Sequence, residues 1–408
     1  MIQVKKNRGG HHIFTPLRDL LNDSRTTGVL LVICTVLSLL LTNSFGSGWF
    51  NHFWSNPLPG RVFSSLKLPG SPIGWINEFA MSFFFLLAAT EIKRELLSGE
   101  LSSFKKAILP FGAAFGGMLV PALIFSVFNL FTHYSHGWGI PTATDIAFSL
   151  AAASLLGKRF PVSLKILLMA IAIIDDLGAI IVIAMFYGGQ IHWGYLLASA
   201  LIYCSLLYCN RIKIKFGPIQ IVLGFLLWFA MLQSGIEASI TGVLFAFALP
   251  VGALATIEKA IHRYVNFLIL PVFALANTSI LVPSHILDSM TTTVGMGIFF
   301  GLVIGKPVGI FLACRLMVAT NVASLPSSVN WKQVFGMGTL AGIGFTMSIF
   351  TTMLAFTESG IRDIAKISIL VSVGASVVIS YLYFRVIYAK VSNPIPNPLE
   401  HEVQLNLS

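Results

Sequence analysis

Long apolar segments, separated by short charged loops, constrain the fold of this chain more than any other feature. Such segments can cross the roughly 30 Å hydrocarbon core of a bilayer as helices. They are expected near residues 27–43, 77–92, 107–131, 140–157, 163–187, 193–210, 216–232, 236–252, 264–282, 293–320, 334–357 and 364–388. Hydrophobic residues make up 56% of the chain and charged residues only 10%, which is too little polar surface for soluble domains. The sequence therefore predicts an all-α polytopic membrane protein with about twelve transmembrane helices.

The basic residues predict the orientation of these helices. Lys and Arg are retained in the loops on the cytoplasmic side of a membrane. If the N-terminus is cytoplasmic, the loops on that side hold 21 of the 26 Lys and Arg residues. The opposite loops hold only Arg61, Lys67, Arg362 and Lys366. We therefore expect both termini in the cytoplasm, and this topology explains the net charge of +10 without a nucleic-acid partner.

Four charged residues lie well inside the predicted spans: Asp145, Asp175, Asp176 and Lys306. A charged aspartate at the bilayer centre costs about 2.5 to 3.5 kcal/mol on insertion scales, so the adjacent pair is expensive to bury. This expense favours a functional interpretation. The alternative is a structural network between helices, in which Lys306 neutralises one buried carboxylate.

Two of the spans carry sequences that disfavour a continuous helix. The fourth begins "GWGIPTATDIAF", where Pro141 removes a backbone donor, and the eleventh contains "GMGTLAGIGFTMSIF". Close helix packing at the glycines is the alternative for the eleventh span. Each interrupted span is the middle of three, in helices 3–5 and 10–12, and these triplets start on opposite sides of the membrane. Matching interrupted helices in inverted-topology repeats are typical of a transporter with its binding site at the membrane midplane.

Several motifs, in order along the chain, resemble the NhaA-type sodium/proton antiporter family. They are "EIKREL" at 91–96, "ATDIAF" at 143–148, "LMAIAIIDDLGAI" at 168–180, "LILPVFALAN" at 268–277, "GKPVG" at 305–309 and "GIGFTMSIF" at 342–350. The resemblance implies a secondary active antiporter, not an enzyme, that exports Na⁺ or Li⁺ from the cytoplasm in exchange for entering H⁺. No cofactor is expected. Asp176 then matches the principal cation-binding carboxylate, Asp175 its partner paired with Lys306, and Asp145 with Thr144 the contribution of the interrupted fourth helix.

The chemistry of these side chains is compatible with those roles. Na⁺ and Li⁺ are hard cations that prefer carboxylate, carbonyl and water oxygens, by the same logic as calcium and magnesium. Burial makes the charged form of a carboxylate unfavourable, so such a site binds either a proton or the cation. Adjacent residues on a helix lie about 100° apart. We therefore expect Asp176 to face an aqueous funnel while Asp175 turns toward Lys306, which either carries a proton or only stabilises the pair.

The same resemblance implies a charged cluster at the cytoplasmic mouth that influences activation by pH. Its members would be Glu91, Arg94, Glu95 and Glu258. A charged helix end that follows the positive-inside rule is the structural alternative for each of them. This chain departs from the best-known family member at Glu237, Lys259 and Ala260, which replace two histidines and a valine there. Glu237 is therefore a further candidate for pH regulation, with a profile that differs from that relative.

We expect a cytoplasmic N-terminal tail at 1–26, a transmembrane antiporter domain at 27–390 and a cytoplasmic C-terminal tail at 391–408. Within the domain, we expect an ion-binding core at 107–187 and 293–388, an interface or scaffold at 27–92 and 236–282, and an outer loop or hairpin at 45–74. The expected location is the inner membrane of a bacterium, as a homodimer in contact with the lipid bilayer.

A sodium-coupled solute symporter of related inverted-repeat fold is the main alternative function. An intramembrane aspartyl protease is a weaker one, because such an enzyme has no need of Lys306.

Overall fold

The computed structural model of the protein describes residues 24–44, 48–59, 65–99, 101–157, 160–283, 286–326 and 329–389. All regular elements among them are helical. Within the described ranges, eight helices are long and apolar enough to cross a membrane, or nine if one bent pair is counted as a single span. The prediction of a polytopic helical membrane protein is therefore confirmed. Arg61, the C-terminal tail and residues 1–23 of the N-terminal tail lie outside the described residues.

The elements of the first half of the chain are α2 (Ser24–Ser44), α3 (Trp49–Ser55), α5 (Pro72–Trp75), η1 (Ile76–Ala80), α6 (Met81–Ser98), α7 (Phe104–Asn129), η2 (Ser135–Thr142), α8 (Ile146–Leu155), α9 (Val162–Phe186) and α10 (Trp193–Arg211). Those of the second half are α11 (Pro218–Ser234), η4 (Ala238–Ile240), α12 (Thr241–Ala248), α13 (Val251–Tyr264), η5 (Val265–Ile269), α14 (Leu270–Asn277), α15 (Ile286–Thr291), α16 (Thr293–Phe300), η6 (Gly301–Gly305), α17 (Lys306–Ala319), α18 (Trp331–Ala341), α19 (Phe345–Ala355) and α20 (Ser359–Ala389).

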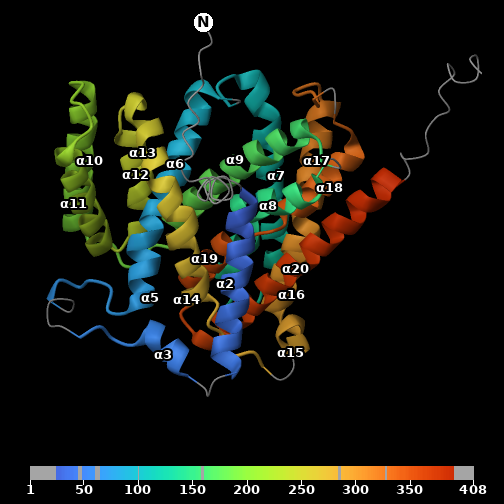
Figure 1. Ribbon diagram of the computed structural model, residues 1–408, viewed down its shortest axis with the longest axis horizontal. Coiled ribbons are helices and arrows are strands. Elements are labelled where there is room, and N and C mark those ends of the chain that lie inside the picture. The colour runs from blue at the N-terminus through green and yellow to red at the C-terminus, as the bar shows by residue number, and fades with distance from the viewer. Residues whose placement is uncertain are drawn as a thin grey trace, which may run out of the picture.

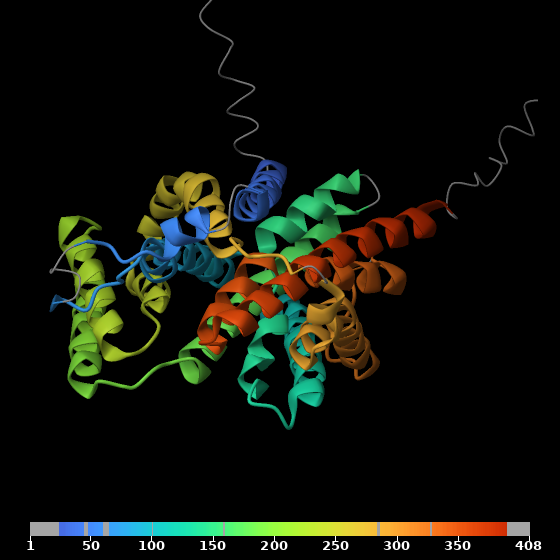
Figure 2. The ribbon, with the colours of Figure 1, turned by 90° about the horizontal axis from the view of Figure 1, so that it is seen from below.

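The helices form two groups that lie side by side (Figure 1, Figure 2). In the first group, α6 packs against α12 and α13, and α10 packs against α11. In the second, α7 packs against α9, α16 and α17, while α20 packs against α16, α18 and α19. Helix α2 stands between the groups, because it packs on α8 of one and α14 of the other. Asp145, Asp175 and Asp176 belong to the second group. Glu91, Arg94, Glu95 and Glu258 belong to the first.

Three of the twelve expected spans are short in the structure. Ile146–Leu155, Pro218–Ser234 and Ala238–Ala248 are apolar helices of 10–17 residues, shorter than a full crossing. A helix rises about 1.5 Å per residue, so a 10-residue helix covers only about half of the hydrocarbon core. The count of twelve transmembrane helices therefore stays a prediction.

Two segments differ from the expected boundaries. The span expected at 264–282 begins earlier, because α13, η5 and α14 form one helical segment, Val251–Asn277. Its first turns carry the charged residues that had indicated a loop, and a helix that extends beyond the hydrocarbon core can hold such residues. In the expected outer loop or hairpin, α3 is helical, and the Leu58 N–H donates to the Gly70 carbonyl at 2.7 Å. Residues 60–64 of this loop lie outside the described part of the chain.

Candidate functional site

The two interrupted spans break where the sequence predicted, and the breaks cross each other. Helix η2 ends at Thr142 and α8 begins at Ile146, while α18 ends at Ala341 and α19 begins at Phe345. The second break bends its helices by 49°. The Asp145 N–H donates to the Ile343 carbonyl at 2.7 Å, so backbone groups freed by one break are satisfied by the other. We call residues 143–145 and 342–344 the crossing.

Glycine has two separate uses near the crossing. A Cβ atom at Gly344 would lie 2.8 Å from the Ala143 carbonyl oxygen, so only glycine lets the two broken segments approach this closely. A Cβ atom at Gly338 would lie 2.6 Å from Cα of Pro307, which is a close contact between α18 and α17. The two interpretations of the glycine-rich eleventh span, unwinding and close packing, therefore both hold, at different glycines.

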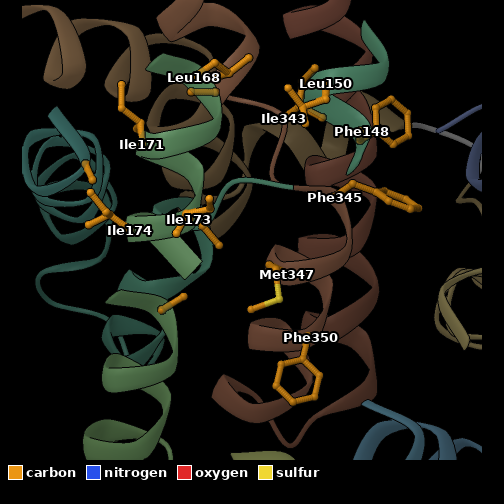
Figure 3. Close-up of a cluster of buried hydrophobic side chains, with 14 of the residues drawn as sticks. Phe148, Leu150, Leu168, Ile171, Ile173, Ile174, Ile343, Phe345, Met347 and Phe350 are labelled. Atoms are coloured by element: carbon orange, nitrogen blue, oxygen red, sulfur yellow. The ribbon is translucent and has the colours of Figure 1, made fainter. Parts of the chain in front are cut away.

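Apolar side chains pack around much of the crossing. Figure 3 shows Phe148 and Leu150 of α8, Ile173 of α9, and Phe345, Met347 and Phe350 of α19 around the point where the extended backbone passes between helices. Phe345 and Phe350 are each only 1% exposed. Electrostatic interactions are stronger in such an environment than in water. The charged residues described next therefore depend on their few direct partners.

Asp145 joins the N-termini of the two half-helices α8 and α19. As the N-cap of α8, it accepts a hydrogen bond at Oδ1 from the Phe148 N–H at 2.9 Å. At Oδ2 it accepts from Thr346 twice, from the N–H at 3.1 Å and from the hydroxyl at 2.6 Å. A carboxylate is stabilised at a helix N-terminus by the free N–H groups and the helix dipole. Asp145 thus compensates both helix ends at once.

Asp175 and Lys306 form a fully buried ion pair. Both side chains are 0% exposed, and Lys306 Nζ contacts Asp175 Oδ2. The Thr144 hydroxyl lies 2.7 Å from the same Oδ2 and 2.9 Å from the Ala341 carbonyl oxygen. Asp175 Oδ1 has no hydrogen-bond partner among the described residues. The ion pair therefore links α9 to α17, and Thr144 joins the crossing to this pair.

Asp176 turns in a different direction from its neighbour. It lines a cavity of about 260 Å³, which does not include Asp175 in its wall. The residue is 3% exposed, and its Oδ1 has no hydrogen-bond partner within the described part of the chain. Buried polar atoms are nearly always hydrogen-bonded, so an unpartnered carboxylate oxygen on a side chain that lines a cavity marks Asp176 as a candidate ligand-binding group. The cavity wall also includes Thr144, Asp145 and Thr346.

The same cavity reaches the residues expected at the mouth. Glu91, Arg94 and Glu95 of α6 line it together with His262 of α13. Arg94 Nη1 donates to both carboxylate oxygens of Glu258, at 2.7 and 2.8 Å, and this pair joins α6 to α13. We call Glu91, Arg94, Glu95 and Glu258 the charged mouth. One cavity, with both polar and apolar side chains in its wall, therefore extends from the charged mouth to Asp176.

The structure does not bring every predicted residue into this cavity. Glu237 lies at the start of η4, where its Oε1 accepts from the Ser239 N–H at 3.4 Å. Its carboxyl group lies near that of Glu78 in η1. Neither residue lines the cavity that holds Asp176. Glu237 is thus separate from the charged mouth.

The three aspartates do not form a preformed metal cage. Among the described residues, no three His, Cys, Asp or Glu side chains converge closely enough to hold one metal ion. Asp145 is bound to Thr346 and Asp175 to Lys306, so of the two aspartates in the cavity wall it is Asp176 that has a carboxylate oxygen without a partner among the described residues. Thr346 was not identified from the sequence. The one signal for it is a hydroxyl group two residues after the glycine break, at the start of a helix.

Comparisons with known proteins identify the relatives of this chain. The model of the family described as Na+/H+ antiporter 1 matches residues 18–384. A protein of Flavobacterium psychrophilum named Na(+)/H(+) antiporter NhaA is 44% identical over 90% of this chain and 95% of its own. Na(+)/H(+) antiporter NhaA 2 of Flavobacterium johnsoniae is 46% identical over 85% of this chain and 86% of its own. Na(+)/H(+) antiporter NhaA of Escherichia coli O139:H28 is 42% identical over 88% and 95%, respectively.

Proposed function

The chain belongs to the Na+/H+ antiporter 1 family, and from this premise we propose how its buried carboxylates exchange the two ions. It is a multi-pass membrane protein and a Na⁺/H⁺ antiporter. We propose that it exports Na⁺ or Li⁺ from the cytoplasm while protons enter, with no resident cofactor and no chemical conversion of a substrate. The sodium-coupled symporter is not favoured, because the relatives are named as Na⁺/H⁺ antiporters.

We propose Asp176 as the principal cation ligand. The observation that supports this role is its buried Oδ1, which has no partner among the described residues and belongs to a side chain that lines the cavity. A dehydrated Na⁺ or Li⁺ ion needs several oxygen ligands. The cavity offers the carboxylate of Asp176, the hydroxyls of Thr144 and Thr346, and space for water. A proton on Asp176 would satisfy the same oxygen, so the proton and the cation exclude each other.

Asp175 and Lys306 supply the second exchangeable charge. The free Oδ1 of Asp175 can turn toward a cation bound at Asp176, because the two residues are adjacent on α9. Approach of the cation then weakens the hold of Asp175 on Lys306. An ammonium group without its counter-charge in a dry environment is strongly disfavoured. Lys306 can then release a proton, which would make it part of the exchange and not only a structural partner.

The crossing is the part of the site that moves in this proposal. Helices 3–5 and 10–12 would be inverted repeats, and their joint movement relative to the other group of helices would expose Asp176 to one side of the membrane and then to the other. Asp145 would stay bound between the two half-helix N-termini throughout. Because its three hydrogen bonds hold α8 and α19 together, the half-helices would move as one body.

The orientation follows from the charge of the loops. We propose a bacterial inner membrane protein with both termini in the cytoplasm, so that the charged mouth faces the cytoplasm. The cavity would then be open on the side from which Na⁺ is collected. Glu91, Arg94, Glu95 and Glu258 would influence the pH at which this entrance becomes active, with a separate contribution from Glu237. A homodimer in contact with bilayer lipid is the proposed assembly.

Transport in everted membrane vesicles that carry a pH-gradient dye tests the proposal. Addition of Na⁺ or Li⁺ should collapse the gradient, and K⁺ should have little effect. Asp176→Asn should abolish the response while the protein is still inserted in the membrane. Glu358→Gln, which changes an exposed acidic residue far from the cavity wall, is the matched control and should leave the response unchanged. Normal activity of the Asp176→Asn variant would contradict the assignment.

A further inference from the structure

The broken fourth segment is attached to α9 at two separate points. At the site end, the Thr144 hydroxyl lies 2.7 Å from Asp175 Oδ2. At the far end, η2 contacts Tyr187, the residue that follows the last residue of α9. Residues 140–143 lie between these two attachments. The position of the crossing relative to the aspartates of α9 therefore depends on both of them.

The hydrogen bonds of the far attachment are made by the Tyr187 hydroxyl group. It accepts a hydrogen bond from the Gly139 N–H at 3.1 Å and donates to the His136 carbonyl oxygen at 2.7 Å. A tyrosine phenol has an ordinary pKa of about 10, so the hydroxyl is protonated at neutral pH and can donate. Both partners are backbone groups of the η2 region. The attachment therefore fixes the path of the backbone and not merely one side chain.

The close contact with Tyr187 leaves no room for a Cβ atom at position 139, which is a glycine. A Cβ atom there would lie 2.6 Å from the Tyr187 hydroxyl oxygen and 3.1 Å from Cε2 of its ring. The neighbouring residues also connect the two elements, since the rings of Trp138 and Phe186 meet edge to face with centroids 5.2 Å apart. Helix η2 is thus packed tightly against the end of α9.

The spacing along α9 connects this attachment to the ion site. Tyr187 follows Asp176 by eleven positions. At about 100° per residue, eleven residues are close to three full turns, so the two side chains leave α9 on nearly the same face. The chain from His136 to Asp145 runs along that face. A displacement of η2 at Tyr187 would therefore be transmitted to Thr144 and Asp145.

The two attachments differ in what competes for them. Asp175 Oδ2, which Thr144 contacts, is shared with Lys306 and lies beside the proposed cation ligand, so this contact can be exchanged. The two backbone groups named above are the only hydrogen-bond partners of the Tyr187 hydroxyl among the described residues. The segment is thus fixed at Tyr187 and held by an exchangeable contact at Thr144. This arrangement is expected where a binding site must keep its geometry while its ligand changes.

We infer that Tyr187 is a positioning residue: its hydroxyl anchors η2 to α9 and thereby sets how Thr144 and Asp145 stand relative to Asp175 and Asp176. The inference rests on the proposed function of these residues. It assigns to Tyr187 an effect on cation affinity, although Tyr187 does not line the cavity. Nothing in its position suggests a direct contact with the ion.

Tyr187→Phe is the direct test, because it removes both hydrogen bonds and keeps the ring. The apparent KM for Na⁺ and for Li⁺, measured in everted vesicles, should rise about three- to tenfold, because losing two neutral hydrogen bonds loosens the positioning of the site without removing a cation ligand. The maximal rate per inserted molecule should change less than about twofold. Tyr195→Phe, at a 47% exposed tyrosine of α10, is the matched control and should have the wild-type KM. A lower maximal rate with an unchanged KM would mean a purely structural role and would overturn the inference.

Gly139→Ala perturbs the same contact from the other side and should also raise the KM. If both changes act through one attachment, the double variant should raise the KM by clearly less than the product of the two single effects. Multiplicative effects would contradict a shared attachment. If Tyr187→Phe does not reach the membrane, Gly139→Ala decides alone, and a wild-type KM in that variant would overturn the inference.

Asp176→Asn in the same membranes separates this inference from the proposed function. If Asp176→Asn transports normally, the proposed function fails whatever Tyr187 does. If Asp176→Asn is inactive and Tyr187→Phe has the wild-type KM, the site assignment stands and the positioning role fails.

Discussion

The buried ion pair and the pair at the charged mouth have the same chemistry in opposite surroundings. Lys306 and Asp175 are both 0% exposed, whereas Arg94 is 45% exposed and Glu258 is 16% exposed. An exposed pair contributes only about 0–1 kcal/mol, because water solvates the separated charges almost as well. Removing one partner of a buried pair costs about 3–5 kcal/mol, because a charge is left without compensation. The difference indicates that the free energy that depends on the bound ion comes mainly from the buried pair of Lys306 and Asp175. The charged mouth can only modulate it.

Lys306→Ala should give the largest effect. The variant leaves Asp175 with the Thr144 hydroxyl as its only remaining partner among the described residues, so the apparent melting temperature in detergent should fall strongly. Lys105→Ala, at an exposed lysine, is the control and should melt like the wild type. If stability falls more than transport does, the role of Lys306 is mainly structural. A Lys306→Ala variant that melts with the control would contradict a buried ion pair.

Thr346→Val should give an intermediate effect. It removes the 2.6 Å hydroxyl bond to Asp145 and keeps the volume and the backbone N–H bond. Loss of a hydrogen bond to a charged group costs about 1.5–3 kcal/mol, so both thermal stability and transport should fall measurably. Thr351→Val is matched to it, since the Thr351 hydroxyl bonds only the Met347 carbonyl within the same helix. Equal melting temperatures for the two variants would mean that Asp145 does not depend on Thr346.

Arg94→Gln should give the smallest effect on stability, below about 1 kcal/mol, because the mouth pair is exposed. Its contribution should decrease further at high salt, where exposed charges are screened. We expect the visible change in the dependence of transport on pH instead. Vesicle assays at several pH values, with melting temperatures measured in parallel, would separate the two. A loss of stability as large as that of Lys306→Ala would remove the distinction between the two pairs.

The charged residues of the site could be predicted from the sequence because each is conspicuous in an apolar span. Asp145, Asp175, Asp176 and Lys306 all occupy positions where a charge is unfavourable unless it is used. The breaks were also predictable, since proline and clustered glycines disfavour a continuous helix. Adjacent positions on a helix diverge, which led to the expectation that Asp175 and Asp176 point apart; the structure has Asp175 on Lys306 and Asp176 in the cavity.

Uncharged polar residues could not be predicted in the same way. A threonine or tyrosine in or beside an apolar helix is common, because its hydroxyl can bond the backbone of its own helix, as that of Thr351 does. Thr346 and Tyr187 differ from such residues only in their partners, which lie on other segments far along the chain. The early start of α13 was missed for another reason, since its charged first turns have the composition of a loop. Only the three-dimensional arrangement supplies these facts.

The central claim is that Na⁺ and protons compete for Asp176, and proton release from the purified protein measures it most directly. The protein in detergent, in weakly buffered solution with a pH-indicator dye, receives NaCl or LiCl, and KCl as the control salt. The account predicts proton release on addition of Na⁺ or Li⁺, little release with K⁺, and loss of the Na⁺ response in folded Asp176→Asn. Undiminished proton release from Asp176→Asn on addition of Na⁺ would contradict it.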